Sequence, residues 1–160
     1  MLKPITVATG IAGTLDLLSA FVFAGLAGMG PVQVLQFVAS GPLGDTALAG
    51  SGYAVAGVLV HFAIMACMVA AYMIVAQRVP VLVRRPLIAG IVYGLLLWFI
   101  MYWVVRPLRW ASLPHPTNPK AIANQLFSHL VLVGIPIALV AARYLRPQKT
   151  GTTQHASMGA

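Results

Sequence analysis

The chain has 160 residues, of which 60% are apolar and only 8% are charged, and its mean hydropathy is +0.91. Soluble domains contain about 25% charged residues, so this composition excludes an ordinary water-soluble domain. The single cysteine, Cys67, excludes a disulfide-stabilised scaffold.

The net charge is +8, because ten Lys and Arg residues stand against two acidic residues. In a soluble protein this excess would suggest nucleic-acid binding. Here the cations flank apolar segments instead of forming a patch interleaved with aromatic residues, which is typical of membrane proteins. We therefore expect a lipid bilayer, and no nucleic acid, as the partner of this chain.

Four apolar segments are each long enough to cross a hydrocarbon core, which needs about 20 helical residues. They cover approximately residues 4–28, 52–76, 86–105 and 119–143. The apolar runs are continuous instead of alternating, which favours helices over β-strands. The sequence thus predicts an all-α, polytopic membrane protein: one four-transmembrane-helix bundle over residues 1–146.

The connections between these segments also carry predictions. Residues 32–39 are too few to cross a membrane, and their apolar side chains share one helical face, so we expect a short interfacial helix after the first span. Ser51 is a candidate N-cap of the second span. Arg106-Pro107 is expected to close the third span. The polar residues 147–160 predict a disordered tail.

The distribution of cations predicts the orientation. Three of them, Arg106, Arg109 and Lys120, fall on one side of the four spans. The other seven fall on the opposite side: Lys3, Arg78, Arg84, Arg85, Arg143, Arg146 and Lys149. The more basic side faces the cytoplasm, so we expect a bacterial cytoplasmic (inner) membrane protein with both termini and the tail inside.

Small residues four positions apart allow helix backbones to approach closely. The chain has three such sets: Gly90 with Gly94; Ala20, Ala24 and Gly28; and Ala63, Cys67 and Ala71. They favour a helix bundle without indicating which faces meet.

Three ionisable residues, Asp16, His61 and His129, lie inside the apolar segments. Such residues are costly at membrane depth and usually face the bundle interior, where they are candidates for function. We expect them to form a buried polar cluster. Asp16 is either a proton- or cation-binding site or a neutral carboxyl that holds helices together.

His61 and His129 each lie about 13 Å below the outer start of their helices. A shared depth would suit two axial ligands of haem b, or two ligands of another metal. Gly57, one turn before His61, would leave room for a flat ring. Arg106, Arg109 and Lys120 would meet the haem propionates or lipid headgroups.

A structural interpretation of the histidines is also open. Each imidazole could bond to a neighbouring helix, with Asn124, Gln125 or Ser128 as candidate partners. Met65, Met68 and Tyr72 follow His61 on one helical stripe, which suits Cu(I) but is more typical of adaptable packing. Five aromatic residues fit an interfacial or lipid-facing belt: Tyr93, Trp98, Tyr102, Trp103 and Trp110.

Short motifs occur throughout the segments: Gly13-Thr14-Leu15-Asp16, Ala39-Ser40-Gly41-Pro42-Leu43-Gly44, His61-Phe62, Tyr93-Gly94, Arg106-Pro107-Leu108, and His129 with Val133-Gly134-Ile135-Pro136. In this combination, over about residues 5–145, the chain resembles small uncharacterised bacterial inner-membrane proteins described as YagU-like. The resemblance implies a four-span inner-membrane protein and transfers no site residue.

The chain contains no recognisable catalytic motif, such as a phosphate-binding loop or His-Glu-x-x-His. The first hypothesis is therefore a non-enzymatic membrane protein, either a homo-oligomer or an accessory subunit of a larger complex. The alternatives are a haem b redox protein that uses His61 and His129, and a proton-linked channel or transporter centred on Asp16.

Overall fold

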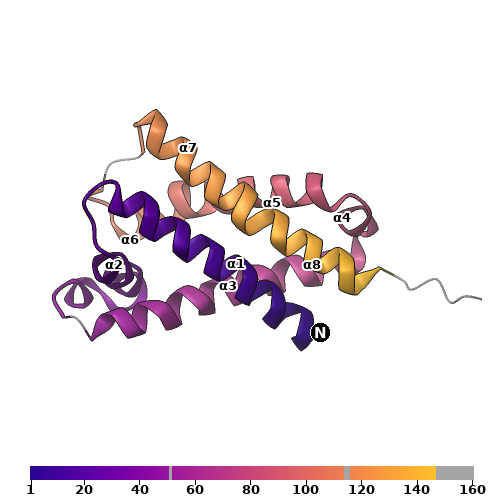
Figure 1. Ribbon diagram of the computed structural model, residues 1–160, viewed down its shortest axis with the longest axis horizontal. Helices are drawn as coiled ribbons and strands as arrows, with labels where there is room; N and C mark the ends of the chain where they lie inside the picture. The colour runs from indigo at the N-terminus through magenta and orange to yellow at the C-terminus, as the bar shows by residue number, and fades with distance from the viewer. Residues whose placement is uncertain (51, 114–115, 147–160) are drawn as a thin grey trace, which may run out of the picture.

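The computed structural model describes residues 1–50, 52–113 and 116–146, and this part of the chain is helical with no strand (Figure 1). Four helical spans are long and apolar enough to cross a membrane. They are α1 (Leu2–Gly25); α3 (Tyr53–Arg78); α5 (Pro86–Phe99) continued by η2 (Ile100–Val105) and α6 (Arg106–Arg109); and α7 (Pro119–Phe127) continued by η3 (Ser128–Gly134) and α8 (Ile135–Leu145). The predicted four-helix, integral membrane fold is confirmed. The expected tail at residues 147–160 and the Ser51 cap lie outside the described residues.

Successive spans run in opposite directions, so the N-terminus and the last residues of α8 lie at one end of the bundle (Figure 1). The short helix α4 (Pro80–Arg84) lies at this end, which we call the N-terminal end. Helix α2 (Pro31–Leu43) and the 3-10 turn η1 (Asp45–Leu48) lie at the opposite end, the α2 end. Helix α2 runs across the bundle axis, as an interfacial helix would.

Two boundaries differ from the sequence-based expectations. The expected interfacial helix of residues 32–39 is longer, because α2 accommodates Pro42 in its last turn. The third span does not close at Arg106-Pro107 but continues to Arg109. Proline clashes with the carbonyl four residues earlier in a regular α-helix. The wider π-helical turn η2 precedes Pro107 and relieves this clash.

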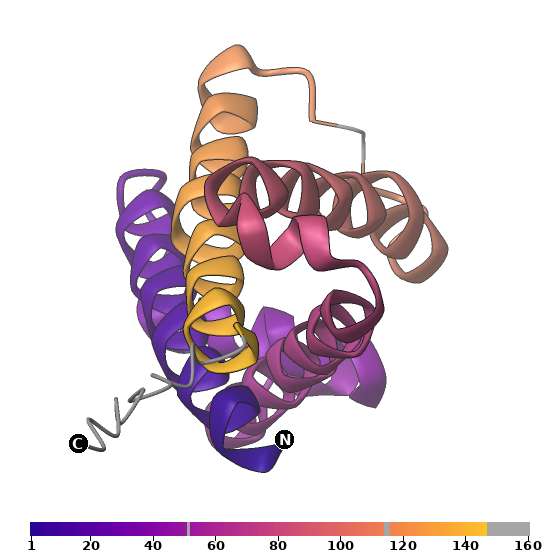
Figure 2. The same cartoon turned by 90° about the vertical axis from the view of Figure 1, so that its right-hand side faces the viewer.

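The fourth span is the most buried of the four and packs against all the others. Figure 2 shows it between α1 and α5. Its contact with α5 depends on three glycines, Gly90, Gly94 and Gly134. A Cβ atom on Gly90 would fall 2.7 Å from the Cα atom of Ile135, and one on Gly94 would fall 2.7 Å from the Cα atom of Leu130. The pair Gly90 and Gly94 therefore does bring two helix backbones together.

The core lies where α1, α3 and α8 meet. Its members with no exposed surface are small or flexible apolar residues: Ala8, Ala12, Val69, Met73, Ile137, Ala138 and Ala141. Lipid and the protein interior are equally apolar, so close packing and hydrogen bonds between helices, more than burial from water, hold such spans together.

Candidate functional site

The imidazole of His61 bonds to the backbone of the first span. Its Nε2 atom lies 2.9 Å from the carbonyl oxygen of Gly13. A carbonyl only accepts, so Nε2 carries the proton and donates it. The absence of a side chain on Gly13 also leaves space for the Phe62 ring, which a Cβ atom there would approach to 2.7 Å. His61 thus has the structural role of joining α3 to α1.

His129 bonds to its own helix. Its Nδ1 atom lies 2.9 Å from the carbonyl oxygen of Gln125, one turn earlier. The ring also meets the Tyr102 ring edge to face, with 5.8 Å between the ring centres. Tyr102 lies in η2 and His129 in η3, so a π-helical segment positions each partner. Such segments widen a helix by one residue per turn and are frequent at functional sites.

Asp16 lies half-buried in α1, and its carboxylate forms no hydrogen bond or ion pair with the described residues. Its charge acts on the phenol of Tyr102, as does that of Arg106. Tyr102 therefore contacts a histidine on the fourth span and lies within the electrostatic influence of an acid on the first. We call Asp16, Tyr102, Arg106 and His129 the Tyr102 cluster.

Two serines join the first and fourth spans next to this cluster. The hydroxyl oxygens of Ser19 and Ser128 lie 2.9 Å apart, and both residues are buried. Ser19 also lies 2.8 Å from the carbonyl oxygen of Asp16. Ser128 lies 3.1 Å from the carbonyl oxygen of Asn124. Each hydroxyl has one proton, so a serine that donates to the other serine does not donate to its own carbonyl at the same time.

Contacts with α1 show that the two histidines lie at different levels of the bundle. His61 meets Gly13, whereas Ser128, the neighbour of His129, meets Ser19. These α1 residues are six positions apart, which corresponds to about 9 Å along the helix. His129 therefore lies beside Tyr102, whereas His61 contacts Gly13 at another level of the bundle.

The arrangement does not favour a haem shared by the two histidines. The Nε2 atom of His61, the nitrogen farthest from its backbone, already bonds to Gly13. The space beside Gly57 is filled by the backbone of Leu35 in α2, which a Cβ atom at Gly57 would overlap. The described residues contain no group of three His, Cys, Asp or Glu side chains placed to hold a metal. Haem binding stays a prediction that a reduced-minus-oxidised spectrum of the purified protein tests.

The methionine stripe after His61 is packing. Met65 and Tyr72 are buried in the core, and Met68 packs against it. The Tyr72 hydroxyl donates to the carbonyl oxygen of Leu82. These contacts favour the packing interpretation over a copper site.

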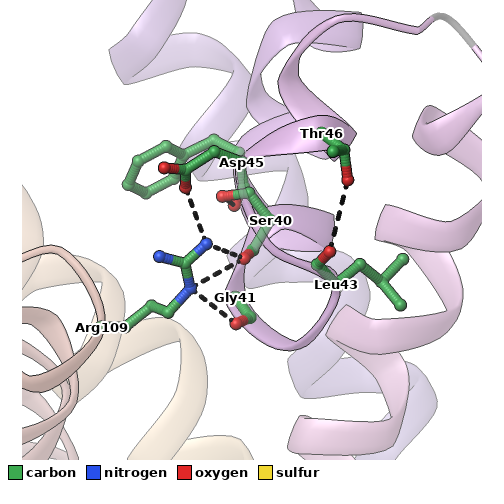
Figure 3. Close-up of polar contacts among 7 residues, drawn as sticks. Ser40, Gly41, Leu43, Asp45, Thr46 and Arg109 are labelled. Atoms are coloured by element: carbon green, nitrogen blue, oxygen red, sulfur yellow. Dashed lines mark hydrogen bonds and ion pairs between the residues drawn. The ribbon is translucent and has the colours of Figure 1, made fainter.

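Arg109 has a structural role at the α2 end (Figure 3). Its Nε atom donates to the carbonyl oxygens of Ser40 at 2.9 Å and Gly41 at 2.8 Å. One terminal nitrogen donates to Ser40 at 2.6 Å and to a carboxylate oxygen of Asp45 at 2.8 Å. The last carbonyls of a helix lack partners and carry partial negative charge, so Arg109 caps α2.

The neighbouring residues strengthen this junction. Trp110 stacks on Phe37 of α2, with 4.6 Å between ring centres, and the guanidinium of Arg109 lies 5.3 Å from the Trp110 ring centre. Arg109 thus contacts residues of its own chain instead of the expected haem propionates or lipid headgroups. Lys120 is exposed at the start of α7 and keeps the prediction of a headgroup contact.

Of the five residues of the predicted aromatic belt, Trp103 is exposed and the other four are half-buried, so the belt stays a prediction. Tyr93 donates to the carbonyl oxygen of Met68 at 2.7 Å, and Trp98 donates to the side chain of Gln125 at 3.3 Å. Tyr102 was missed as a site residue. Its position four residues before Arg106, on the same helical face, is the signal that could have indicated it.

No protein-family model, curated protein or solved structure matches the chain. The contacts described above therefore carry the functional argument.

Proposed function

We propose that this chain is a non-enzymatic protein of the bacterial cytoplasmic membrane, with both termini in the cytoplasm, that works as a homo-oligomer. Its four-span layout agrees with the resemblance to YagU-like proteins. If a different protein chain covers the same surface, this protein is instead an accessory subunit of a larger complex.

The observation that carries the proposal is an unused helix-packing face on α3. Of the small-residue sets, Gly90 and Gly94 pack within the chain, but Ala63, Cys67 and Ala71 are all exposed. Small residues at this spacing let another helix approach closely, and van der Waals packing drives association in lipid. In a two-fold dimer the same face of each copy meets the other, so Cys67 would lie opposite its counterpart.

Cysteine cross-linking in membranes tests this directly, because Cys67 is the single cysteine of the sequence. Mild oxidation should produce a disulfide-linked dimer from the unaltered chain. The matched control carries Cys67→Ala with Leu95→Cys, which places a thiol on an exposed position of α5. Cross-linking of both variants to the same extent, or of neither, contradicts the homo-oligomer.

The mass of the protein in mild detergent distinguishes a homo-oligomer from an accessory subunit. A homo-oligomer gives a multiple of the monomer mass, and Ala63→Leu should lower it to that of the monomer. A monomer that forms no Cys67 cross-link would favour a different chain as the partner.

The unpaired carboxylate of Asp16 favours a second candidate, a proton-linked channel or transporter. A charged carboxylate without a partner is unfavourable in a membrane, and residues of this kind mark proton and ion pathways. The Tyr102 hydroxyl and the His129 imidazole provide groups that can pass a proton across the bundle. In this mechanism Asp16 binds the proton.

Proton flux into liposomes that contain the purified protein tests this candidate. Asp16→Asn should abolish the flux and Tyr102→Phe should reduce it, because each removes a proton-binding group at nearly constant volume. Ser19→Ala is the control, since it alters the adjacent interhelical bond and leaves the Tyr102 cluster intact. Flux that survives Asp16→Asn rejects Asp16 as the site.

A further inference from the structure

The N-terminal end of the bundle has an uncompensated positive charge. Six exposed cations of the described residues lie there: Lys3, Arg78, Arg84, Arg85, Arg143 and Arg146. The whole sequence has two acidic residues, Asp16 within the first span and Asp45 at the opposite end. None of the six cations forms a salt bridge within the described residues.

The α2 end is different. There Asp45 pairs with Arg109, whose guanidinium also caps α2. Arg106 and Lys120 are the remaining cations near that end, and neither forms a salt bridge with the described residues. The two ends therefore differ in unpaired charge as well as in the number of cations.

Helix α4 brings several of these cations together at the N-terminal end. The guanidinium of Arg146 donates to the carbonyl oxygen of Val83 at 3.1 and 3.2 Å, which fixes the end of α4 against the end of α8. Arg84 and Arg85 directly follow Val83, and Arg143 is one turn before Arg146 on α8. Arg146 is used for this contact, whereas the guanidinium groups of Arg84, Arg85 and Arg143 form no hydrogen bond or salt bridge with the described residues.

Apolar side chains are exposed on the same segment. Val81 of α4 and Leu87 at the start of α5 have more than half of their surface exposed, at 53% and 56%. A short helix with exposed apolar side chains beside arginines is typical of the boundary between headgroups and acyl chains. A soluble anion would contact only the arginines, whereas a lipid would contact both sets.

We propose that Arg84, Arg85 and Arg143 bind the phosphodiester headgroups of anionic phospholipids. The guanidinium group matches phosphate oxygens with paired hydrogen bonds, and basic segments beside a span attract anionic lipids. Bound headgroups neutralise the repulsion among the six cations. The acyl chains of the same lipids cover Val81 and Leu87.

Lipid titration of the full-length protein in a neutral detergent tests this site. Dioleoyl-phosphatidylglycerol should raise the Tm and stay bound in native mass spectrometry, with an affinity at least about tenfold above that of dioleoyl-phosphatidylcholine. The triple variant Arg84→Gln, Arg85→Gln and Arg143→Gln should lose at least about tenfold in affinity for the anionic lipid. Raising the salt from about 0.05 M to about 0.5 M should weaken binding to the unaltered chain.

Two controls isolate the effect of charge at this end. Replacement of the same three arginines by lysine should retain most of the binding, and Lys120→Gln at the α2 end should retain all of it. The proposal is overturned by equal affinity for the two lipids, by unchanged binding in the glutamine variant, or by equally tight binding of glycerol phosphate. Where the glutamine variant does not fold, salt-independent binding of phosphatidylglycerol to the unaltered chain overturns it.

Discussion

The guanidinium of Arg109 lies 2.6 Å from the carbonyl oxygen of Ser40, a residue with no exposed surface. This contact joins the end of the third span to the helix that crosses the bundle. A charged donor to a buried carbonyl contributes about 1.5–3 kcal/mol. The ion pair with Asp45, whose side chain is 76% exposed, contributes less than about 1 kcal/mol because solvent screens it.

Substitutions at this junction should therefore have unequal effects. We expect Arg109→Ala to lower the free energy of unfolding by about 2–3 kcal/mol and Asp45→Asn to lower it by less than about 1 kcal/mol. Equilibrium unfolding in mixed detergent micelles measures both, with Lys120→Ala as the control at the same end. Equal losses for Arg109→Ala and Asp45→Asn would show that the ion pair, and not the α2 cap, is the main contribution.

The glycine contact between the third and fourth spans gives a second prediction. Gly94→Ala places a methyl group against the backbone of His129 and Leu130, which cannot shift as a flexible side chain would. Overpacking of this kind costs about 1–3 kcal/mol, and the same unfolding measurement detects it. Gly10→Ala is the matched control, because apart from the adjacent backbone of its own helix no heavy atom lies within 4 Å of a Cβ atom there. A loss as large in the control as in Gly94→Ala contradicts this explanation.

The number and order of the spans could be predicted from the sequence, because lipid supplies no hydrogen-bond partners and a long apolar run must satisfy its own backbone. The spacing of Gly90 and Gly94 also indicated a close helix contact. Rotation of each helix about its axis could not be predicted. In a membrane the lipid-facing and interior sides of a helix are both apolar, so the hydrophobic periodicity that would indicate its rotation is weak.

The histidines illustrate the consequence of unknown rotation. Depth along the chain suggested a pair, but His61 faces Gly13 on the first span and His129 faces Gln125 and Tyr102. The π-helical segments η2 and η3, which contain Tyr102 and His129, add a second reason, since their turns differ from the regular helical spacing that a sequence pattern assumes. The contact between Tyr102 and His129 thus depends on local helix geometry as well as on residue spacing.

The hydroxyl contact between Ser19 and Ser128 allows a double-mutant cycle. Interhelical hydrogen bonds in membranes contribute about 0.6 kcal/mol on average, with a maximum of about 1.7 kcal/mol. We expect a coupling energy in this range between Ser19→Ala and Ser128→Ala, from the unfolding free energies of the two single variants and the double variant. Ser40→Ala paired with Ser19→Ala is the control, because Ser40 donates to Phe37 at the α2 end and should show no coupling. Strict additivity for Ser19 and Ser128 would contradict the contact.

The orientation of the bundle is tested by cysteine accessibility with substitutions that leave every charge in place, since the cations themselves determine topology. Thr46 in η1 and Val81 in α4 are both exposed and lie at opposite ends of the bundle. In a Cys67→Ala background, we expect a membrane-impermeant thiol reagent to label Thr46→Cys in intact cells. Val81→Cys should react only after the membrane is opened. Labelling of both positions from one side contradicts the four-span threading, whereas the reverse pattern retains the threading and inverts the orientation, placing the termini outside.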